Sequence, residues 1–350
     1  MEELKMKTKT IARYFLILAV AVMCAGTAAA RHKLTGEKPR VYVNPGHGGH
    51  DDDDRYEPFY NQAARDTVAY YESDSNLGVG NALVDLLKKK GYDVYTSRVN
   101  NGTYDDLDLF EICQLAEDSG ADMFFCIHSN DTGTDVRVNF PLALYHGWAG
   151  QPVSAGSDSI ASYVMRRLYA SKATCWSRRP MISGDWTFYP HWGYRTGLGV
   201  LRYNKLPGML SEAVYHDYLP ERERLLNKDY NWLEGWLHSL AIDEYFGRLG
   251  NYAKGSISGI VRYNQLRVDS ATTKTYGDDA YQPVSGAVVR LFDSKGKELR
   301  TYTTDHLNNG YYLFSDLTPG EYVIRVDGIA QRASKVSVTA NAPSYCNIFF

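Results

Sequence analysis

Apolar and polar positions between residues 40 and 247 predict strands that alternate with helices. Short runs rich in apolar, β-branched or aromatic residues, typical of strands, occur at 41–44, 92–98, 122–128, 197–203 and 208–215. Apolar residues at helical spacing predict helices at 76–91, 108–120, 157–171 and 220–247. Strands separated by helices favour a mainly parallel sheet that helices cover on both faces, with its chemistry at the carboxyl ends of the strands. We therefore expect an α/β domain over residues 38–248.

The pattern changes after this domain. Helical spacing disappears, and short runs rich in β-branched and aromatic residues alternate with turns such as SKGK, LNNG and TPG. This spacing is typical of an all-β sandwich. Residues 255–350 are therefore predicted to form a separate small β-sandwich domain.

The N-terminus has the pattern of a secretory signal peptide over residues 1–30. A basic head precedes the apolar run FLILAVAVMCAG, and Ala28–Ala30 supplies an Ala-x-Ala cleavage signal. The apolar run is too short for a transmembrane helix. The mature chain is thus expected to hold no integral membrane span and to act in the periplasm, in the cell envelope or outside the cell. Lipidation at Cys24 is the alternative, although Val22-Met23 before it is a poor lipoprotein signal.

Composition narrows the class of protein. The chain has 350 residues and a formal net charge of -3, which gives no basic face for nucleic acid. Its 28 tyrosines against 12 phenylalanines suit a surface that binds carbohydrate or peptide. The cysteines that remain after the signal peptide are scattered, so they indicate neither a disulfide framework nor a cysteine metal site; they are Cys113, Cys126, Cys175 and Cys346.

Four side chains lie where the predicted sheet would present its chemistry: His47, Glu72, His128 and Glu212. Two histidines and a carboxylate suit zinc, and three protein ligands leave a fourth position for water. A further carboxylate is then needed to move the proton of that water. Each residue also has a structural alternative: a turn histidine, an acid at a helix N-terminus, a hydrogen-bonded histidine at a strand end, and an ion pair. Periodicity alone does not decide between these readings.

Sequence blocks decide between them. PGHGG, then Glu72 with Asn76 and Leu77, then IHSN, then LSEAVY resemble, in order, the blocks of the zinc-dependent N-acetylmuramoyl-L-alanine amidases, which cut bacterial peptidoglycan. The resemblance covers roughly residues 40–247. It implies that His47, Glu72 and His128 hold one zinc ion and that Glu212 is the catalytic carboxylate. It also implies peptidoglycan or muropeptides as the partner, and it identifies no protein activator.

Three features depart from that family. Asn44 occupies the position before Pro-Gly where the family usually has Asp, a change expected to affect the turn or the support of the ligands. The gap between His47 and Glu72 is longer than usual, and residues 175–197 form an aromatic and basic segment with no family counterpart. Such insertions are expected to shape substrate recognition, and the candidates for substrate contact are Asn130, His191 and Arg195.

The C-terminal region resembles the transthyretin-like β-sandwich modules attached to carboxypeptidases and to many exported bacterial proteins. SGIVRY, PVSGAVVRLFD and GYYLFSDLTPGEYVIRV carry this resemblance. It implies an accessory role without catalysis. Two alternatives for the whole chain stay open: an exported zinc peptidase that acts on other peptides, and a non-catalytic wall-binding protein. Nucleotide binding by PGHGG is disfavoured because the stretch lacks GxxxxGK[ST] or GxGxxG spacing.

Overall fold

The computed structural model describes residues 36–349 apart from 51–55, 134–135, 172–173, 251 and 329–333. The predicted signal peptide, Cys24 and the acidic run Asp51–Asp54 lie outside the described residues. No helix of the described part of the chain is long and apolar enough to cross a membrane.

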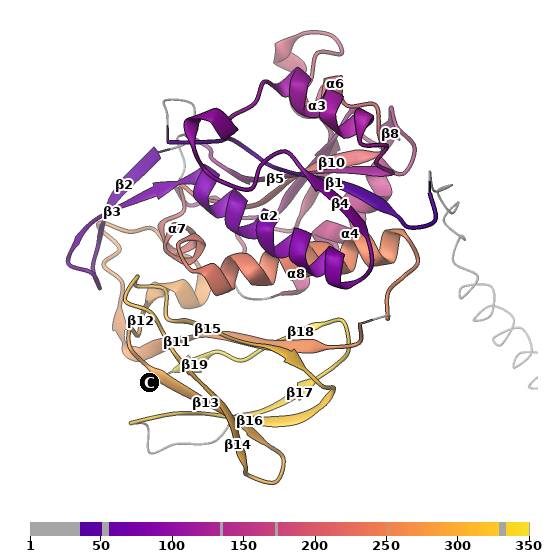
Figure 1. Cartoon of the computed structure of the whole chain (residues 1–350). Coiled ribbons are helices and arrows are strands. Elements are labelled where there is room, and N and C mark those ends of the chain that lie inside the picture. The colour runs from indigo at the N-terminus through magenta and orange to yellow at the C-terminus, as the bar shows by residue number, and fades with distance from the viewer. Residues whose placement is uncertain are drawn as a thin grey trace, which may run out of the picture. The chain divides into compact units, whose positions relative to one another are not determined.

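A six-stranded sheet forms the centre of the first region (Figure 1). Its strands, in spatial order, are β4 (Asp93–Thr96), β1 (Arg40–Pro45), β5 (Met123–Asn130), β10 (Gly208–Tyr215), β6 (Leu142–Tyr145) and β9 (Met181–Gly184). The first four run parallel, while β6 pairs antiparallel with β10 and parallel with β9. The predicted mainly parallel sheet is therefore confirmed.

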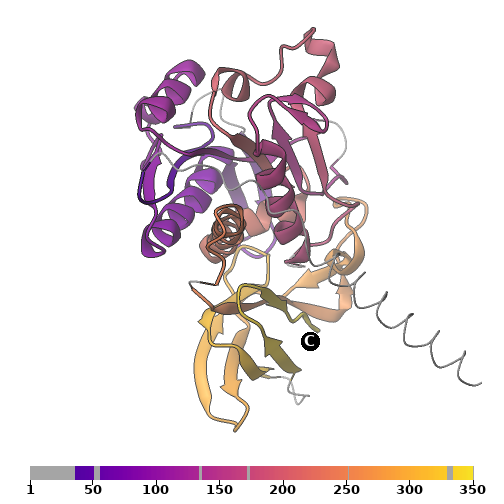
Figure 2. The same cartoon turned by 90° about the vertical axis from the view of Figure 1, so that its right-hand side faces the viewer.

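Helices cover both faces of this sheet (Figures 1 and 2), as expected. One face packs against α2 (Glu72–Lys89), α4 (Ser157–Ala170) and α8 (Lys228–Tyr245), and the other against α3 (Leu109–Asp118) and α6 (Gly199–Tyr203). Alternate strand residues point to opposite faces. Accordingly, Val43 and Phe125 join the core beneath α2 and α8, while Tyr42 and Phe124 join the core beneath α3 and α6.

Two predicted elements differ from the structure. Residues 197–203 were expected to form a strand, but Gly199–Tyr203 is the helix α6, which buries Val200 and Leu201 against α3. So short an apolar run fits either pattern, and packing decides between them. The long helix predicted at 220–247 is divided into α7 (Leu219–Leu225) and α8, because the side chain of Asn227 accepts hydrogen bonds from the backbone N–H groups of Asp229 and Tyr230 and starts a new helix.

A hairpin before α2 was not anticipated from the sequence. β2 (Tyr56–Asn61) and β3 (Asp66–Tyr71) pair antiparallel and lead directly into α2, which therefore begins at Glu72 rather than at residue 76. Short elements also occur between β6 and α6: β7 (Gly147–Trp148), β8 (Gln151–Pro152) and α5 (Asp185–Phe188).

The C-terminal region consists of two sheets that pack face to face around their own core, which confirms a β-sandwich. Val289, Leu291, Phe314 and Ile324 belong to this core. One sheet contains β12 (Tyr281–Pro283), β11 (Gly255–Arg267), β15 (Tyr311–Leu317), β18 (Pro343–Tyr345) and β19 (Ile348–Phe349). The other contains β14 (Glu298–Thr303), β13 (Val288–Asp293), β16 (Gly320–Val326) and β17 (Ser334–Val338).

Candidate active site

Three chain segments meet at the carboxyl ends of β1 and β5. His47 follows β1 in a turn and has a φ of 59°, a left-handed conformation that is uncommon outside glycine. His128 lies near the end of β5, and Glu72 is the first residue of α2. Because β1 and β5 are parallel neighbours, their carboxyl ends place the two histidines side by side, and the helix brings the carboxylate between them.

The three side chains are within contact distance of one another. His47 Nε2 lies 3.2 Å from Glu72 Oε2, and His128 Nδ1 lies 3.0 Å from Glu72 Oε1. The two imidazole rings have their centroids 4.9 Å apart. One ligand-type atom from each residue lies within 4.8 Å of the other two, so a single metal ion fits this donor set.

The Glu72 carboxylate is buried and held by neutral donors as well as by the histidines. Its Oε1 accepts hydrogen bonds from the Ser129 backbone N–H (3.0 Å) and from Asn76 Nδ2 (3.1 Å). Burial by itself raises the pKa of Glu72, but hydrogen bonds from His128 and His47 outweigh it and hold the pKa well below its usual range. Burial also lowers the pKa of His128. An ionised carboxylate and a neutral imidazole are the forms that bind metals.

Close packing fixes the His47 turn. The guanidinium of Arg98 donates to the carbonyls of Pro45 (3.0 Å), Gly46 (2.9 Å) and Ser73 (2.8 Å), and so ties the turn to the first turn of α2. A Cβ at residue 46 would lie 2.1 Å from the His128 ring. Only glycine therefore allows the turn to approach His128 this closely.

Glu212 lies one strand away from His128. In the register of β10 and β5 the two residues are Cα partners, so their side chains leave the same face of the sheet. Glu212 is partly buried. We call His47, Glu72 and His128 the His–Glu–His group. Glu212 places a further carboxylate beside this group but does not belong to it.

An aromatic residue not singled out from the sequence lies near Glu212. Burial and then the negative charge of Glu212 raise the pKa of Tyr189 to about 12. The Tyr189 ring stacks on Trp192, with centroids 3.9 Å apart and planes 2° from parallel. Trp192 is 45% exposed. The unusual density of aromatic residues in 175–197 was the signal for this pair, although it did not indicate which ring approaches the carboxylate.

The predicted substrate-contact residues have different surroundings. Asn130 ends β5 beside Tyr215, and its Oδ1 accepts a hydrogen bond from the Asp131 backbone N–H (2.8 Å). His191 and Arg195 are exposed. The guanidinium of Arg195 lies over the rings of Trp186 and Tyr194, at 5.4 and 5.0 Å from their centroids. Contact of these three residues with substrate stays a prediction.

Asn44 and Cys126 support the strands rather than the metal group. Cys126 is fully buried, and its Sγ accepts a hydrogen bond from Asn44 Nδ2 (3.1 Å). Asn44 Oδ1 in turn accepts one from Ser97 Oγ (2.7 Å), which connects β1 to its neighbours on both sides. Burial raises the pKa of the Cys126 thiol, which disfavours the thiolate that a metal needs.

Replacing Asn76 by alanine removes the Nδ2 donor to Glu72 and is expected to weaken metal binding. Residues that orient metal ligands typically contribute about 10–100-fold in affinity. The measurement is competition for zinc against a chromophoric chelator, with Asn264→Ala as the control because Asn264 is exposed on β11. Equal zinc affinity in the two variants would contradict a supporting role for Asn76.

Two regions of the chain match models of known families. The SdrD B-like domain model matches residues 271–344, which is compatible with the β-sandwich. No curated protein matches the chain. Among solved structures, the chain is similar to the N-acetylmuramoyl-L-alanine amidase AmiC2 of Nostoc punctiforme (21% identity, TM-score 0.46, 60% of this chain and 98% of the other). It is also similar to an N-acetylmuramoyl-L-alanine amidase from Clostridium difficile 630 (21% identity, TM-score 0.47, 61% and 100%).

The decisive match is that of a family model. The N-acetylmuramoyl-L-alanine amidase model matches residues 41–241, more than half of the chain, and this range contains all four candidate residues. The chain belongs to the N-acetylmuramoyl-L-alanine amidase family.

Proposed function

We propose that this protein is an exported zinc-dependent amidase that hydrolyses the bond between N-acetylmuramic acid and L-alanine in peptidoglycan. The observation that carries the proposal is the convergence of His47, Glu72 and His128 within 4.8 Å, with Glu212 on the adjacent strand. In this proposal residues 1–30 are the signal peptide, 38–248 the catalytic domain and 255–350 an accessory domain.

The donor set fits zinc. Two imidazoles and one carboxylate are the ligands of many catalytic zinc sites, in which the remaining position is left for water or substrate. Hydrogen bonds from Asn76 and Ser129 orient the Glu72 carboxylate, as is usual for metal ligands. A zinc ion held by these side chains supplies Lewis-acid chemistry, which polarises a carbonyl and makes water acidic enough to act as a nucleophile near pH 7.

The remaining chemistry falls to the residues of the chain. The carboxylate of Glu212 takes the proton of the attacking water. It then donates that proton to the leaving nitrogen of L-alanine as the amide bond breaks, so a single carboxylate acts first as base and then as acid. The stacked pair Tyr189 and Trp192, together with Asn130, His191 and Arg195, holds the substrate beside this carboxylate.

The test combines metal content with the masses of the products. Purified protein is expected to hold one zinc ion per chain and to release from peptidoglycan stem peptides that begin with a free L-alanine amine. The His47→Ala variant is expected to lose both zinc and product release, because the two remaining ligands bind zinc much more weakly than all three together. His306→Ala is the matched control because His306 lies in the β-sandwich, far along the chain from the candidate site.

Other outcomes would contradict the proposal. Cleavage of ordinary peptides without release of stem peptides would identify a zinc peptidase. Peptidoglycan binding without zinc or hydrolysis would identify a non-catalytic wall-binding protein. A chain retained in the cytoplasm with residues 1–30 uncleaved would contradict export.

A further inference from the structure

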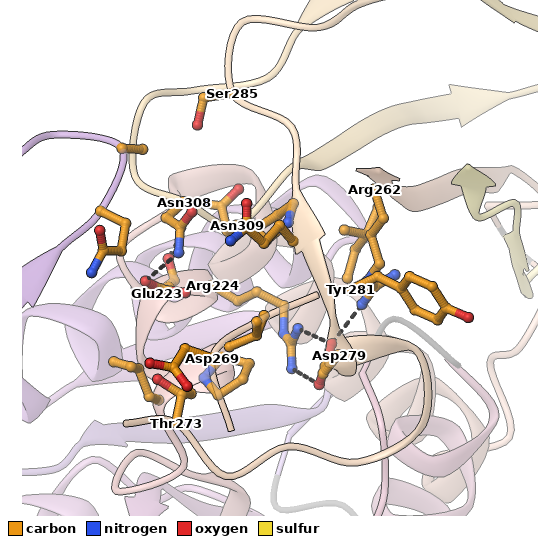
Figure 3. Close-up of a pocket in the computed structure, with 18 of the residues that line it drawn as sticks. Glu223, Arg224, Arg262, Asp269, Thr273, Asp279, Tyr281, Ser285, Asn308 and Asn309 are labelled. Atoms are coloured by element: carbon orange, nitrogen blue, oxygen red, sulfur yellow. Dashed lines mark hydrogen bonds and ion pairs between the residues drawn. The ribbon is translucent and has the colours of Figure 1, made fainter. Parts of the chain in front are cut away.

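A second concave site lies apart from the His–Glu–His group. A cavity of about 830 Å³ is lined by the β2–β3 hairpin, by α7 and by β11, β12 and their loops (Figure 3). We call it the junction cavity; its lining includes Tyr60, Gln62, Glu223, Thr273 and Ser285. Its volume falls within the range of small-molecule sites, roughly 300–1,000 Å³.

Hydrogen bonds hold the walls of the junction cavity together. Asn61, at the tip of the hairpin, is fully buried, and its Nδ2 donates to the Leu307 carbonyl (2.9 Å). Its Oδ1 accepts from the backbone N–H groups of Ala63 and Ala64 and shapes the hairpin turn. The hairpin is thus fixed to a loop of the β-sandwich, and the cavity between them is a preformed feature.

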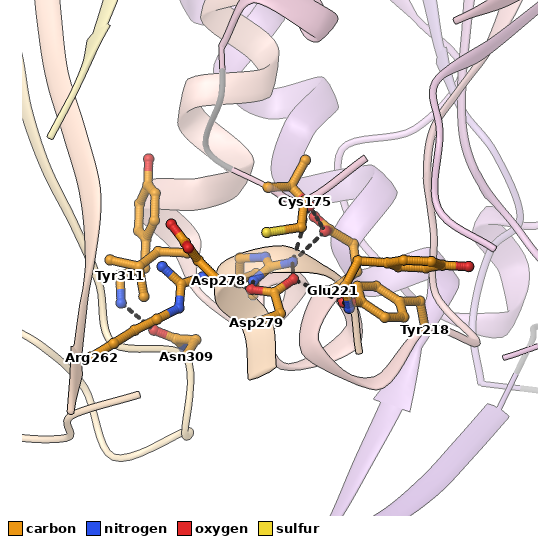
Figure 4. A network of polar contacts seen from close by, with 12 residues as sticks. Cys175, Tyr218, Glu221, Arg262, Asp278, Asp279, Asn309 and Tyr311 are labelled. Carbon is orange, nitrogen blue, oxygen red and sulfur yellow. Dashed lines mark hydrogen bonds and ion pairs between the residues drawn. The ribbon is translucent and has the colours of Figure 1, made fainter. Parts of the chain in front are cut away.

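The buried charges beside the cavity neutralise one another. Arg224 pairs with Glu221 (2.7 Å) and with Asp279 (3.0 Å), and Arg262 pairs with Asp279 (2.5 Å). Figure 4 labels Glu221, Arg262 and Asp279 of this network. The side chains of all four residues, Arg224 included, are at most 2% exposed. Two arginines and two carboxylates sum to no net charge.

The other charged residues of the lining add no net charge either. Asn308 Nδ2 donates to Glu223 Oε1 (2.8 Å), and burial raises the pKa of Glu223 to about 8, which leaves this carboxyl largely neutral at pH 7. Arg65 and Asp269 are exposed and opposite in sign. The junction cavity therefore suits a neutral ligand better than an ionic one.

Hydrogen-bonding groups remain available in the lining. Gln62 and Thr273 place an amide and a hydroxyl in the lining. Gln62 is exposed, so its amide can reach a ligand in the cavity.

Aromatic rings complete the lining. Phe59 and Tyr60 come from the hairpin, and Tyr263 and Tyr281 from the β-sandwich. Tyr60 is 55% exposed although it lines a cavity. Rings with a flat apolar face beside neutral hydrogen-bonding groups match the surface of a sugar, which presents C–H groups on its faces and hydroxyl and amide groups at its edges.

We propose that the junction cavity binds a neutral saccharide of N-acetylhexosamine units. Such a site would hold the glycan strand of the polymer while amide bonds are cut at the His–Glu–His group. The identity of the glycan rests on the proposed function, because peptidoglycan strands are built from such units; the binding itself does not.

The experiment measures binding of an N-acetylglucosamine tetramer to the full chain by calorimetry. Tyr60→Ala and Gln62→Ala are expected to weaken binding about three- to tenfold each, the effect of losing one ring contact or one hydrogen bond. Both residues are exposed, so the fold is expected to be retained. Tyr104→Ala is the matched control, because Tyr104 is 99% exposed and does not line the cavity.

The outcomes separate this proposal from the amidase proposal. Absence of tetramer binding, or equal affinity in Tyr60→Ala and Tyr104→Ala, would overturn the saccharide site even if stem peptides are released from peptidoglycan. Loss of binding in Trp192→Ala but not in Tyr60→Ala would assign the sugar to the cleft beside Glu212 and overturn it as well. Tyr60-dependent binding without stem-peptide release would support the saccharide site and contradict the amidase.

Discussion

The Glu212→Gln variant is expected to retain zinc and to lose peptidoglycan hydrolysis by about 10²–10⁴-fold, the contribution of a positioned proton carrier. Glutamine has nearly the shape of glutamate but accepts no proton at neutral pH, so the β10 strand and its register with His128 are expected to persist. The loss is expected in kcat rather than in KM, because the substitution removes an interaction of the transition state.

The measurement is stem-peptide release per minute at saturating peptidoglycan, with zinc content determined on the same samples. Glu111→Gln is the matched control, since Glu111 is exposed on α3. Loss of zinc in Glu212→Gln would instead place Glu212 among the ligands, and hydrolysis equal to that of Glu111→Gln would remove it from the mechanism.

The Arg224→Ala variant is expected to lower the free energy of unfolding by about 3–5 kcal/mol, the cost of breaking a buried ion pair by removing one partner. Arg224 contacts the carboxylates of Glu221 and Asp279 from a side chain that is 2% exposed. Without it, Glu221 keeps only neutral partners, Tyr230, Thr174 and Asn139, and a negative charge is left buried without its counter-ion.

Denaturant unfolding followed by tryptophan fluorescence checks this expectation. The matched control is Arg290→Ala, because Arg290 also pairs with two carboxylates, Glu298 and Asp327, but does so at the surface, where ion pairs contribute little. A midpoint for Arg224→Ala as high as that for Arg290→Ala would show that the buried network does not stabilise the fold.

Much of the fold could be predicted because local patterns report burial directly. The predicted strands 41–44, 122–128 and 208–215 lie within or close to β1, β5 and β10. A short apolar run bounded by turn residues is consistent with a buried strand, and in these three runs that interpretation was correct. The prediction of a strand at 197–203 was wrong, and the hairpin at 56–71 was missed. The first run is too short for its period to distinguish a strand from a helix, and the second is polar and is fixed by contacts with distant segments.

For the candidate site, the sequence by itself determined the residue types and their order: two histidines and a glutamate, each at the end of a predicted strand or the start of a helix, and Glu212 on a later strand. It also determined the family, because four blocks in order are specific when each alone is weak. Whether these side chains bind zinc and carry out catalysis stays a prediction until metal content and activity are measured.

Only the tertiary structure decided which of these side chains meet, because distances between residues 47, 72, 128 and 212 depend on strand order and register rather than on neighbouring residues. It showed that Asn44 bonds to Cys126 and Ser97 instead of facing the ligands. It also brought Tyr189 towards Glu212 and formed the junction cavity from three segments far apart in sequence. Such contacts arise when separate elements bury their apolar faces together, and no local pattern encodes them.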